Sequence, residues 1–137
     1  MIKKSYEIKN LYKHYNYYLF YGKNDGAKRE EIEKIILSNK NKSLSKYDEK
    51  YILDNSESFL TDIYSGSLFE NEKIIIINSA TDKIIEIIEE IFSKRDLNIT
   101  IVIESDALEK KSKLRNLFEK KKELICVPFY PDTNETL

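Results

Sequence analysis

The sequence has few of the residues that crosslink small proteins. Among its 137 residues there is one cysteine, Cys126, and one histidine, His14. A single cysteine excludes an internal disulfide framework, and one cysteine with one histidine excludes the usual four-ligand zinc sites. We expect Cys126, which lies in an apolar stretch, to be a buried hydrophobe, and His14 to be a surface residue. The fold must then rely on a hydrophobic core, which a chain of this length is able to bury.

A surplus of charge and long hydrophobic runs are absent as well. The chain has 23 Lys and Arg residues against 24 Asp and Glu residues, so its overall charge predicts neither strong nucleic-acid binding nor adhesion to a membrane. No apolar run is long enough to span a bilayer, and the first residues lack the apolar core of a signal peptide. The composition, 41% hydrophobic and 34% charged, is that of a folded domain. Together these features favour a protein of the reducing cytoplasm with no membrane partner.

Glycine and proline are scarce, with three and two residues. Two hydrophobic patterns alternate along the chain. Short apolar runs predict strands, and apolar residues at a helical spacing predict helices. The predicted strands cover residues 17–21, 47–53, 74–77, 99–103 and 124–127, and the predicted helices cover residues 2–15, 56–64, 82–93 and 110–122, with one more around residues 32–37. This alternation predicts an α/β fold with a parallel five-stranded sheet covered on both faces, in three layers. We expect the domain to fill residues 1–130, and residues 131–137 to begin a linker to further domains.

The glycine turn after the first predicted strand invites comparison with the phosphate loop, G-x-x-x-x-G-K-[ST]. Counted from Gly22, the chain places Lys28 in register with the lysine of this pattern. Ala27 stands in place of the second glycine, although Gly26 precedes it, and Arg29 replaces the hydroxyl residue that would bind magnesium. We call Gly22, Gly26 and Lys28 the degenerate phosphate loop.

A nucleotide site of this kind also needs a carboxylate at the end of a neighbouring strand to hold magnesium. The third predicted strand ends at Ile77 and is followed by Asn78 and Ser79, neither of which is acidic. The sequence therefore predicts the architecture of a P-loop NTPase core with a degenerate nucleotide site. We expect no catalytic residues, no metal site and no cofactor.

Two large apolar residues, Leu68 and Phe69, stand between polar neighbours. Gly66 and Ser67 precede them, and a charged segment follows before the third predicted strand. A hydrophobic pair on a polar rim is typical of a partner-binding tip. The pattern alone leaves a second interpretation open, in which both side chains join the core at the end of a helix.

Two basic stretches leave a nucleic-acid interface open. Lysines are interleaved with tyrosines near the N-terminus, and a second basic group lies on the last predicted helix. The first group is Lys3, Lys4, Lys9, Lys13 and Lys23, and the second is Lys110, Lys111, Lys113, Arg115 and residues 120–122. Such mixtures can bind phosphate groups and stack bases, but exposed lysines also serve simply to keep a surface soluble.

Four segments, taken in order along the chain, resemble one family. They are Tyr18-Leu19-Phe20-Tyr21-Gly22, then Ser67-Leu68-Phe69 directly before the apolar run 73–77, then residues 101–104, and then residues 107–115, which contain Ser-Lys-Leu-Arg. In this order and at these separations they resemble the N-terminal domain of the delta subunit of bacterial DNA polymerase III, the clamp-opening member of the clamp loader. The resemblance covers about residues 17–127.

The resemblance implies an AAA+-like core that does not bind ATP, in a non-catalytic subunit of a DNA-directed DNA polymerase holoenzyme. In this family a Leu-Phe pair at the tip of a helix inserts into a hydrophobic pocket on the ring-shaped sliding clamp, the beta subunit. Carried over, the pair is Leu68 and Phe69, with Ser67 and Gly66 shaping the approach. The family also implies a lid and a collar domain beyond this chain. Its partners are the gamma or tau and delta-prime subunits, and DNA is reached indirectly, through the complex.

The related gamma and delta-prime subunits carry a Ser-Arg-Cys motif that this chain lacks, which argues against those two subunits. Two further functions stay open. One is a P-loop-type kinase or ATPase with an atypical loop, which would need Lys28 to contact phosphate. The other is a DNA-binding module that uses the basic stretches.

Overall fold

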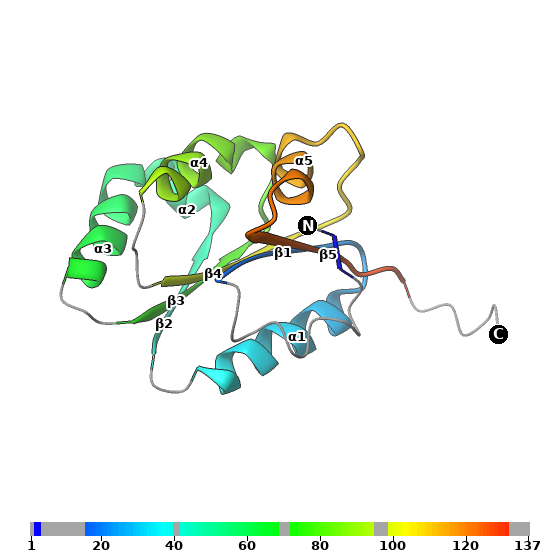
Figure 1. The fold of residues 1–137 in the computed structure, drawn as a ribbon, viewed down its shortest axis with the longest axis horizontal. Coiled ribbons are helices and arrows are strands. Elements are labelled where there is room, and N and C mark those ends of the chain that lie inside the picture. Colours follow the sequence, from blue (N-terminus) through cyan, green and yellow to red (C-terminus); the bar gives the residue numbers. More distant parts are fainter. Residues whose placement is uncertain (1, 4–15, 40–41, 69–71, 95–98, 132–137) are drawn as a thin grey trace.

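A five-stranded, all-parallel sheet forms the centre of the computed structural model (Figure 1). The structure describes residues 2–3, 16–39, 42–68, 72–94 and 99–131, and of residues 66–68 it describes the backbone only. The strands are β1 (Tyr17–Tyr21), β2 (Ser43–Asp48), β3 (Lys73–Asn78), β4 (Ile99–Ser105) and β5 (Leu124–Pro128). They lie in the order β2-β3-β4-β1-β5, so that β1 is flanked by β4 and β5.

Alternate side chains of each strand point to opposite faces of the sheet. In β1, Leu19 pairs with Ile103 of β4 and with Cys126 of β5, and all three side chains belong to one buried cluster. Tyr18 and Phe20 belong to the cluster on the other face. Because the central strands are buried on both faces, their sequences are apolar without alternation. The predicted burial of Cys126 is confirmed.

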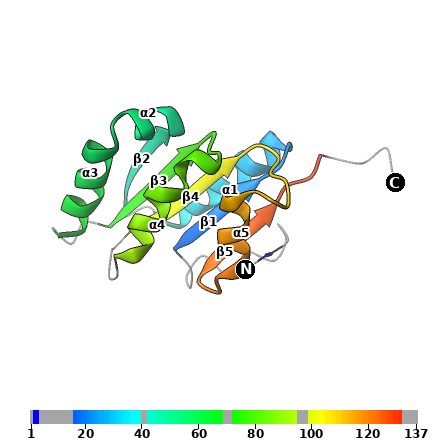
Figure 2. The same ribbon diagram turned by 90° about the horizontal axis from the view of Figure 1, so that it is seen from above.

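The helices cover the two faces of the sheet unequally. One face carries α1 (Asp25–Ser38), and the other carries α2 (Glu49–Asp54), α3 (Ser56–Leu68), α4 (Ile85–Ser93) and α5 (Lys113–Lys120), with a short 3-10 helix, η2 (Asp82–Ile84), before α4 (Figures 1 and 2). The predicted α/β fold with a parallel five-stranded sheet is confirmed, and the arrangement is compatible with three layers. Within the described ranges, no helix has the length and apolar character that crossing a bilayer requires.

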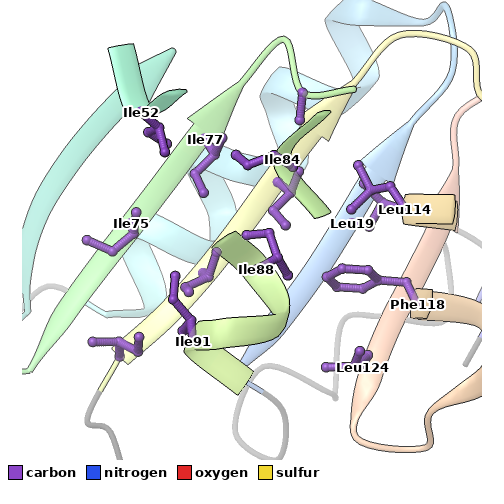
Figure 3. Packing of buried hydrophobic residues seen from close by; sticks show 14 of the residues in the cluster. Leu19, Ile52, Ile75, Ile77, Ile84, Ile88, Ile91, Leu114, Phe118 and Leu124 are labelled. Carbon is purple, nitrogen blue, oxygen red and sulfur yellow. The ribbon is translucent and has the colours of Figure 1, made fainter. Parts of the chain in front are cut away.

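The larger core lies between the sheet and the helices that follow β2, β3 and β4. Ile84, Ile88 and Ile91 recur at helical spacing and point toward the sheet (Figure 3). Leu114 and Phe118 of α5 complete this layer beside them, and all five side chains are fully buried. Burying a side chain of this size contributes about 1.5–3 kcal/mol. This layer therefore fixes α4 and α5 on the sheet.

The prediction of a strand at residues 47–53 is wrong. The structure has β2 at Ser43–Asp48 and a helix from Glu49 onward. Because β2 is an edge strand paired only with β3, most of its side chains are exposed and it needs few apolar residues. Tyr47 is the one that packs inward, with its ring 4.9 Å from that of Phe59. Asp48 and Glu49, two acidic residues within the predicted strand, lie at the start of α2, where the helix dipole favours negative charge.

Three of the predicted helices also differ from those in the structure. The helix expected to end near Tyr64 continues to Leu68, so Gly66 and Ser67 belong to α3. The last helix, α5, covers Lys113–Lys120, a shorter segment than residues 110–122. Ile2 forms a parallel bridge to Cys126 rather than starting a helix. The rest of that predicted helix, His14 included, lies outside the described residues.

The Ser-Lys-Leu-Arg segment begins α5 and is held by a carboxylate from another element. Asp82, in η2, accepts a hydrogen bond from the Ser112 hydroxyl at 2.6 Å. It also accepts from the backbone amides of Lys113 and Leu114, each at 3.1 Å. The Ser112 hydroxyl in turn accepts from the Arg115 amide at 3.2 Å. These bonds satisfy amides that the start of a helix otherwise leaves without partners, so this segment has a structural role.

The stability of this helix start is expected to depend on the ionisation of Asp82. Burial raises the pKa of Asp82, but hydrogen bonds from Ser112 and two backbone amides lower the pKa by more, so the net direction is downward. A lowered pKa in the folded state gives stability that is present above the unfolded value of about 3.9 and is lost as the pH falls through the folded value. We expect Asp82→Asn to cost about 1 kcal/mol at neutral pH and less below about pH 4. Thermal unfolding of both proteins across this range checks the prediction, and a difference that does not change with pH would contradict it.

Candidate functional site

The carboxyl ends of β1 and β4 meet where the chain changes faces of the sheet. From β1 the chain passes to α1 on one face, and from β4 it passes to α5 on the other (Figure 1). Ligands of open parallel sheets bind at such switch points. A cavity of about 710 Å³ opens here, and its charged lining comes from α1, β2 and the end of β4. These charged residues include Lys28, Arg29 and Glu33 of α1, Lys46 of β2, and Glu104 and Asp106.

The turn between β1 and α1 has only three residues, because β1 ends at Tyr21 and α1 begins at Asp25. Gly26 and Lys28 therefore lie in the first turn of α1. The Gly22 amide donates to the Asp106 carbonyl at 3.3 Å. This turn is too short, and too occupied with bonds inside the chain, to wrap around a phosphate group as a phosphate loop does.

The start of α1 is capped by its own chain. The Asn24 side chain accepts a hydrogen bond from the Ala27 amide at 3.1 Å, and the Asn24 carbonyl accepts from the Lys28 amide at 3.1 Å. The Asn24 amide donates to the Phe129 carbonyl at 3.3 Å. A helix N-terminus binds an anion through amides that have no partner in the chain, and these amides already have one.

Lys28 is buried, with 2% of its surface exposed, and its ammonium group is surrounded by oxygen atoms. Its Nζ lies 2.7 Å from Oε2 of Glu104, 2.8 Å from the Ser105 carbonyl oxygen and 3.1 Å from Oδ1 of Asp25. Three oxygen atoms therefore match the three donors of the ammonium group. Lys28, the in-register lysine of the degenerate phosphate loop, is therefore bound to the two last residues of β4.

Glu104 is the residue of this site that sequence reasoning missed. Its second carboxylate oxygen, Oε1, accepts a hydrogen bond from the Ser79 amide at 3.1 Å. Its backbone carbonyl accepts from the Ala80 amide at 2.9 Å. The phosphate-loop pattern leads one to expect an acid after the third strand, which ends at Asn78, whereas Glu104 lies near the end of the fourth. The signal was present in the sequence, as a carboxylate directly after the apolar run that ends at Ile103.

The turn after β3 is held from two sides. Glu104 binds it at Ser79, which has a φ of 58°. Glu49, the first residue of α2, is 7% exposed and accepts a hydrogen bond from the Thr81 hydroxyl at 2.9 Å, as well as one from the Thr81 amide. Two carboxylates from different elements thus fix this turn beside the cavity.

The described residues offer little that could act as a nucleophile or hold a metal. Burial raises the pKa of the Cys126 thiol to about 12, so the thiol is protonated and unreactive at neutral pH. Burial likewise raises the pKa of Tyr21 to about 12. Across the part of the chain that the structure describes, no group of three His, Cys, Asp or Glu side chains is placed to bind a metal ion.

Leu68 is the last residue of α3, and Phe69 lies outside the described residues. The strand that follows, β3, begins at Lys73. α3 returns the chain to the amino end of β3, whereas the cavity opens at the carboxyl ends of the strands. The end of α3 and the degenerate phosphate loop therefore lie at opposite ends of the strands.

The basic stretches have a mixed outcome. Lys113 and Lys120 are exposed at the two ends of α5. Arg115 lies between them and is engaged, since its guanidinium group donates to Glu119 at 2.8 Å and to the Leu108 carbonyl at 2.9 Å. Lys4, Lys9 and Lys13 of the N-terminal stretch lie outside the described residues.

No family model matches the sequence, and no curated protein is significantly similar to it.

Proposed function

We propose that this chain is the N-terminal domain of a clamp-loader subunit of the DNA polymerase III delta type. It binds and opens the sliding clamp during DNA replication through Leu68 and Phe69, and it does not hydrolyse ATP itself. Its partners are the clamp and the other loader subunits, and its location is the cytoplasm. The observation that carries the proposal is the end of α3 at Leu68, followed within five residues by the start of β3.

α3 supports the proposal up to Leu68, which it holds at the end of a regular helix. In the proposal, the apolar pair extends from this helix end to the clamp. Gly66 and Ser67 are small residues within the same last turn. A ligand shifts an equilibrium only through differential affinity, so clamp opening would follow if the pair bound the open form of the clamp more tightly.

The carboxyl edge supports the non-catalytic half of the proposal. β1 is an inner strand of the parallel sheet, and a short turn leads from it to α1. A P-loop NTPase core has the same strand–turn–helix layout, which favours an AAA+-like fold. The turn itself is short and bonded within the chain, and Lys28 is bound to Glu104 rather than open to a phosphate. We infer an AAA+-like domain whose former nucleotide site does not bind nucleotide.

The test is binding of the sliding clamp from the same organism to the wild-type chain and to Leu68→Ala/Phe69→Ala. We expect the double variant to lose detectable clamp binding while its circular dichroism spectrum and melting temperature stay close to those of the wild type. Leu37→Ala is the matched control, because Leu37 lies near the end of α1 and is 62% exposed. That control should bind the clamp normally.

Unchanged clamp binding by the folded double variant would sink the proposal. Calorimetry with Mg-ATP addresses the enzyme alternative, which would be favoured by ATP binding that Lys28→Ala removes. DNA binding by the isolated chain that weakens steeply with salt would favour the DNA-binding module instead.

A further inference from the structure

Two hydrogen-bond donors at the carboxyl edge converge on one carboxylate. The Lys28 ammonium donates to Oε2 of Glu104 at 2.7 Å, and the Ser79 amide donates to Oε1 of the same group at 3.1 Å. A buried ammonium beside a backbone amide is the donor pair that binds phosphate oxygens in proteins. Here each oxygen of one side chain takes one of these donors.

The backbone conformation of Ser79 indicates that the bonds to Glu104 hold the turn after β3 in one conformation. Ser79 has a φ of 58°, the left-handed region that residues other than glycine seldom adopt. Such a conformation persists only where surrounding contacts fix it. The contacts in this case are the Ser79 amide on Glu104 and, at the next residue, the Ala80 amide on the Glu104 carbonyl.

We propose that Lys28 and the Ser79 amide form an oxyanion site, and that the Glu104 carboxylate is its resident anion and keeps phosphate out. Glu104 lines the cavity of about 710 Å³, and its side chain is 20% exposed. Removal of this carboxylate would therefore leave both donors facing a space large enough for a phosphate group. The proposal is independent of clamp binding, since none of its residues belongs to the end of α3.

The test is titration of the chain with inorganic phosphate at constant ionic strength, followed by calorimetry and by thermal unfolding. The wild type should show no saturable binding. Glu104→Ala, which removes the anion and opens space, should show saturable binding, because charge-assisted hydrogen bonds are the strong ones. Its dissociation constant should lie at least about tenfold below the highest phosphate concentration at which the wild type shows none. Glu104→Gln keeps the shape of the side chain, so it tests the loss of charge in a variant that is expected to stay folded. Its gain in phosphate affinity should be smaller than that of Glu104→Ala, because the amide still fills the space.

Two controls make the outcome specific. Glu33→Gln removes a carboxylate from the same cavity but not from Lys28, and it should behave as the wild type does. Lys28→Met combined with Glu104→Ala or with Glu104→Gln should abolish the gain. The proposal is overturned if the folded Glu104 variants bind phosphate no better than the wild type. It is also overturned if the wild type itself binds equally well, or if the gain survives the loss of Lys28.

Discussion

Replacement of Gly22 by alanine is expected to destabilise the fold by about 4 kcal/mol or more, among the largest effects of any single change. Gly22 has a φ of +120°, a conformation in which a side chain is strained. An added Cβ would lie 2.1 Å from the Phe129 carbonyl oxygen and 2.8 Å from its carbon. That backbone cannot move aside easily, since the Phe129 amide donates to the Tyr21 carbonyl at 2.7 Å and the Phe129 carbonyl accepts from Asn24. Urea unfolding of the two proteins measures the loss.

Gly26 provides the matched control, because it belongs to the same degenerate phosphate loop. It lies in the first turn of α1, and an added Cβ would meet only the Asn24 side chain, at 3.9 Å. Gly26→Ala should therefore stabilise the protein, by about 0.5–1 kcal/mol, since alanine is the better helix former. If both glycines tolerated alanine equally, the close packing of Gly22 against Phe129 would be refuted.

This pair of glycines shows what the sequence could predict and what it could not. Gly22 is correctly predicted to end a strand, because an apolar aromatic run stops there. Its tight contact with Phe129 joins residues more than a hundred positions apart, and no local pattern encodes such a contact. The position of Gly26, which lies inside α1, depends on a local contact of another kind. The helix begins as soon as Asn24 can cap it, and the phosphate-loop pattern takes no account of that cap.

The buried strands are the easiest elements to predict, since apolar residues dominate β1, β3, β4 and β5. The edge strand β2 is missed because its side chains are mostly exposed and its pairing uses backbone groups that every residue carries. Glu104 is missed for another reason. An acid at the end of a strand has meaning only when the order of the strands is known, and it is the sheet order that places β4 beside β1.

Replacement of Lys28 by methionine is the second change with a large expected effect, a loss of about 3 kcal/mol. Breaking a buried ion pair by removing one partner costs about 3–5 kcal/mol, because the remaining charge stays in a poorly solvated place. Among the described residues, Glu104 would keep only the Ser79 amide as a donor to its carboxylate, and the Ser105 carbonyl would lose the ammonium it now accepts from. The lower end of the range applies because the Glu104 side chain is 20% exposed, and because Asp25, the third partner, is 76% exposed.

The double variant Lys28→Met/Glu104→Gln separates this electrostatic cost from the loss of lysine packing. With the Glu104 carboxylate neutralised, the charge that loses its partner is that of Asp25, which is 76% exposed and solvated. The double variant should therefore regain at least about 1 kcal/mol over Lys28→Met. A double-mutant cycle with Glu104→Gln, measured by urea unfolding, gives the coupling between the two residues directly. Additive losses would mean that Lys28 stabilises the protein without Glu104, through its aliphatic chain and its bonds to Ser105 and Asp25. A favourable coupling would show that the ion pair holds α1, the end of β4 and the turn after β3 together as one unit.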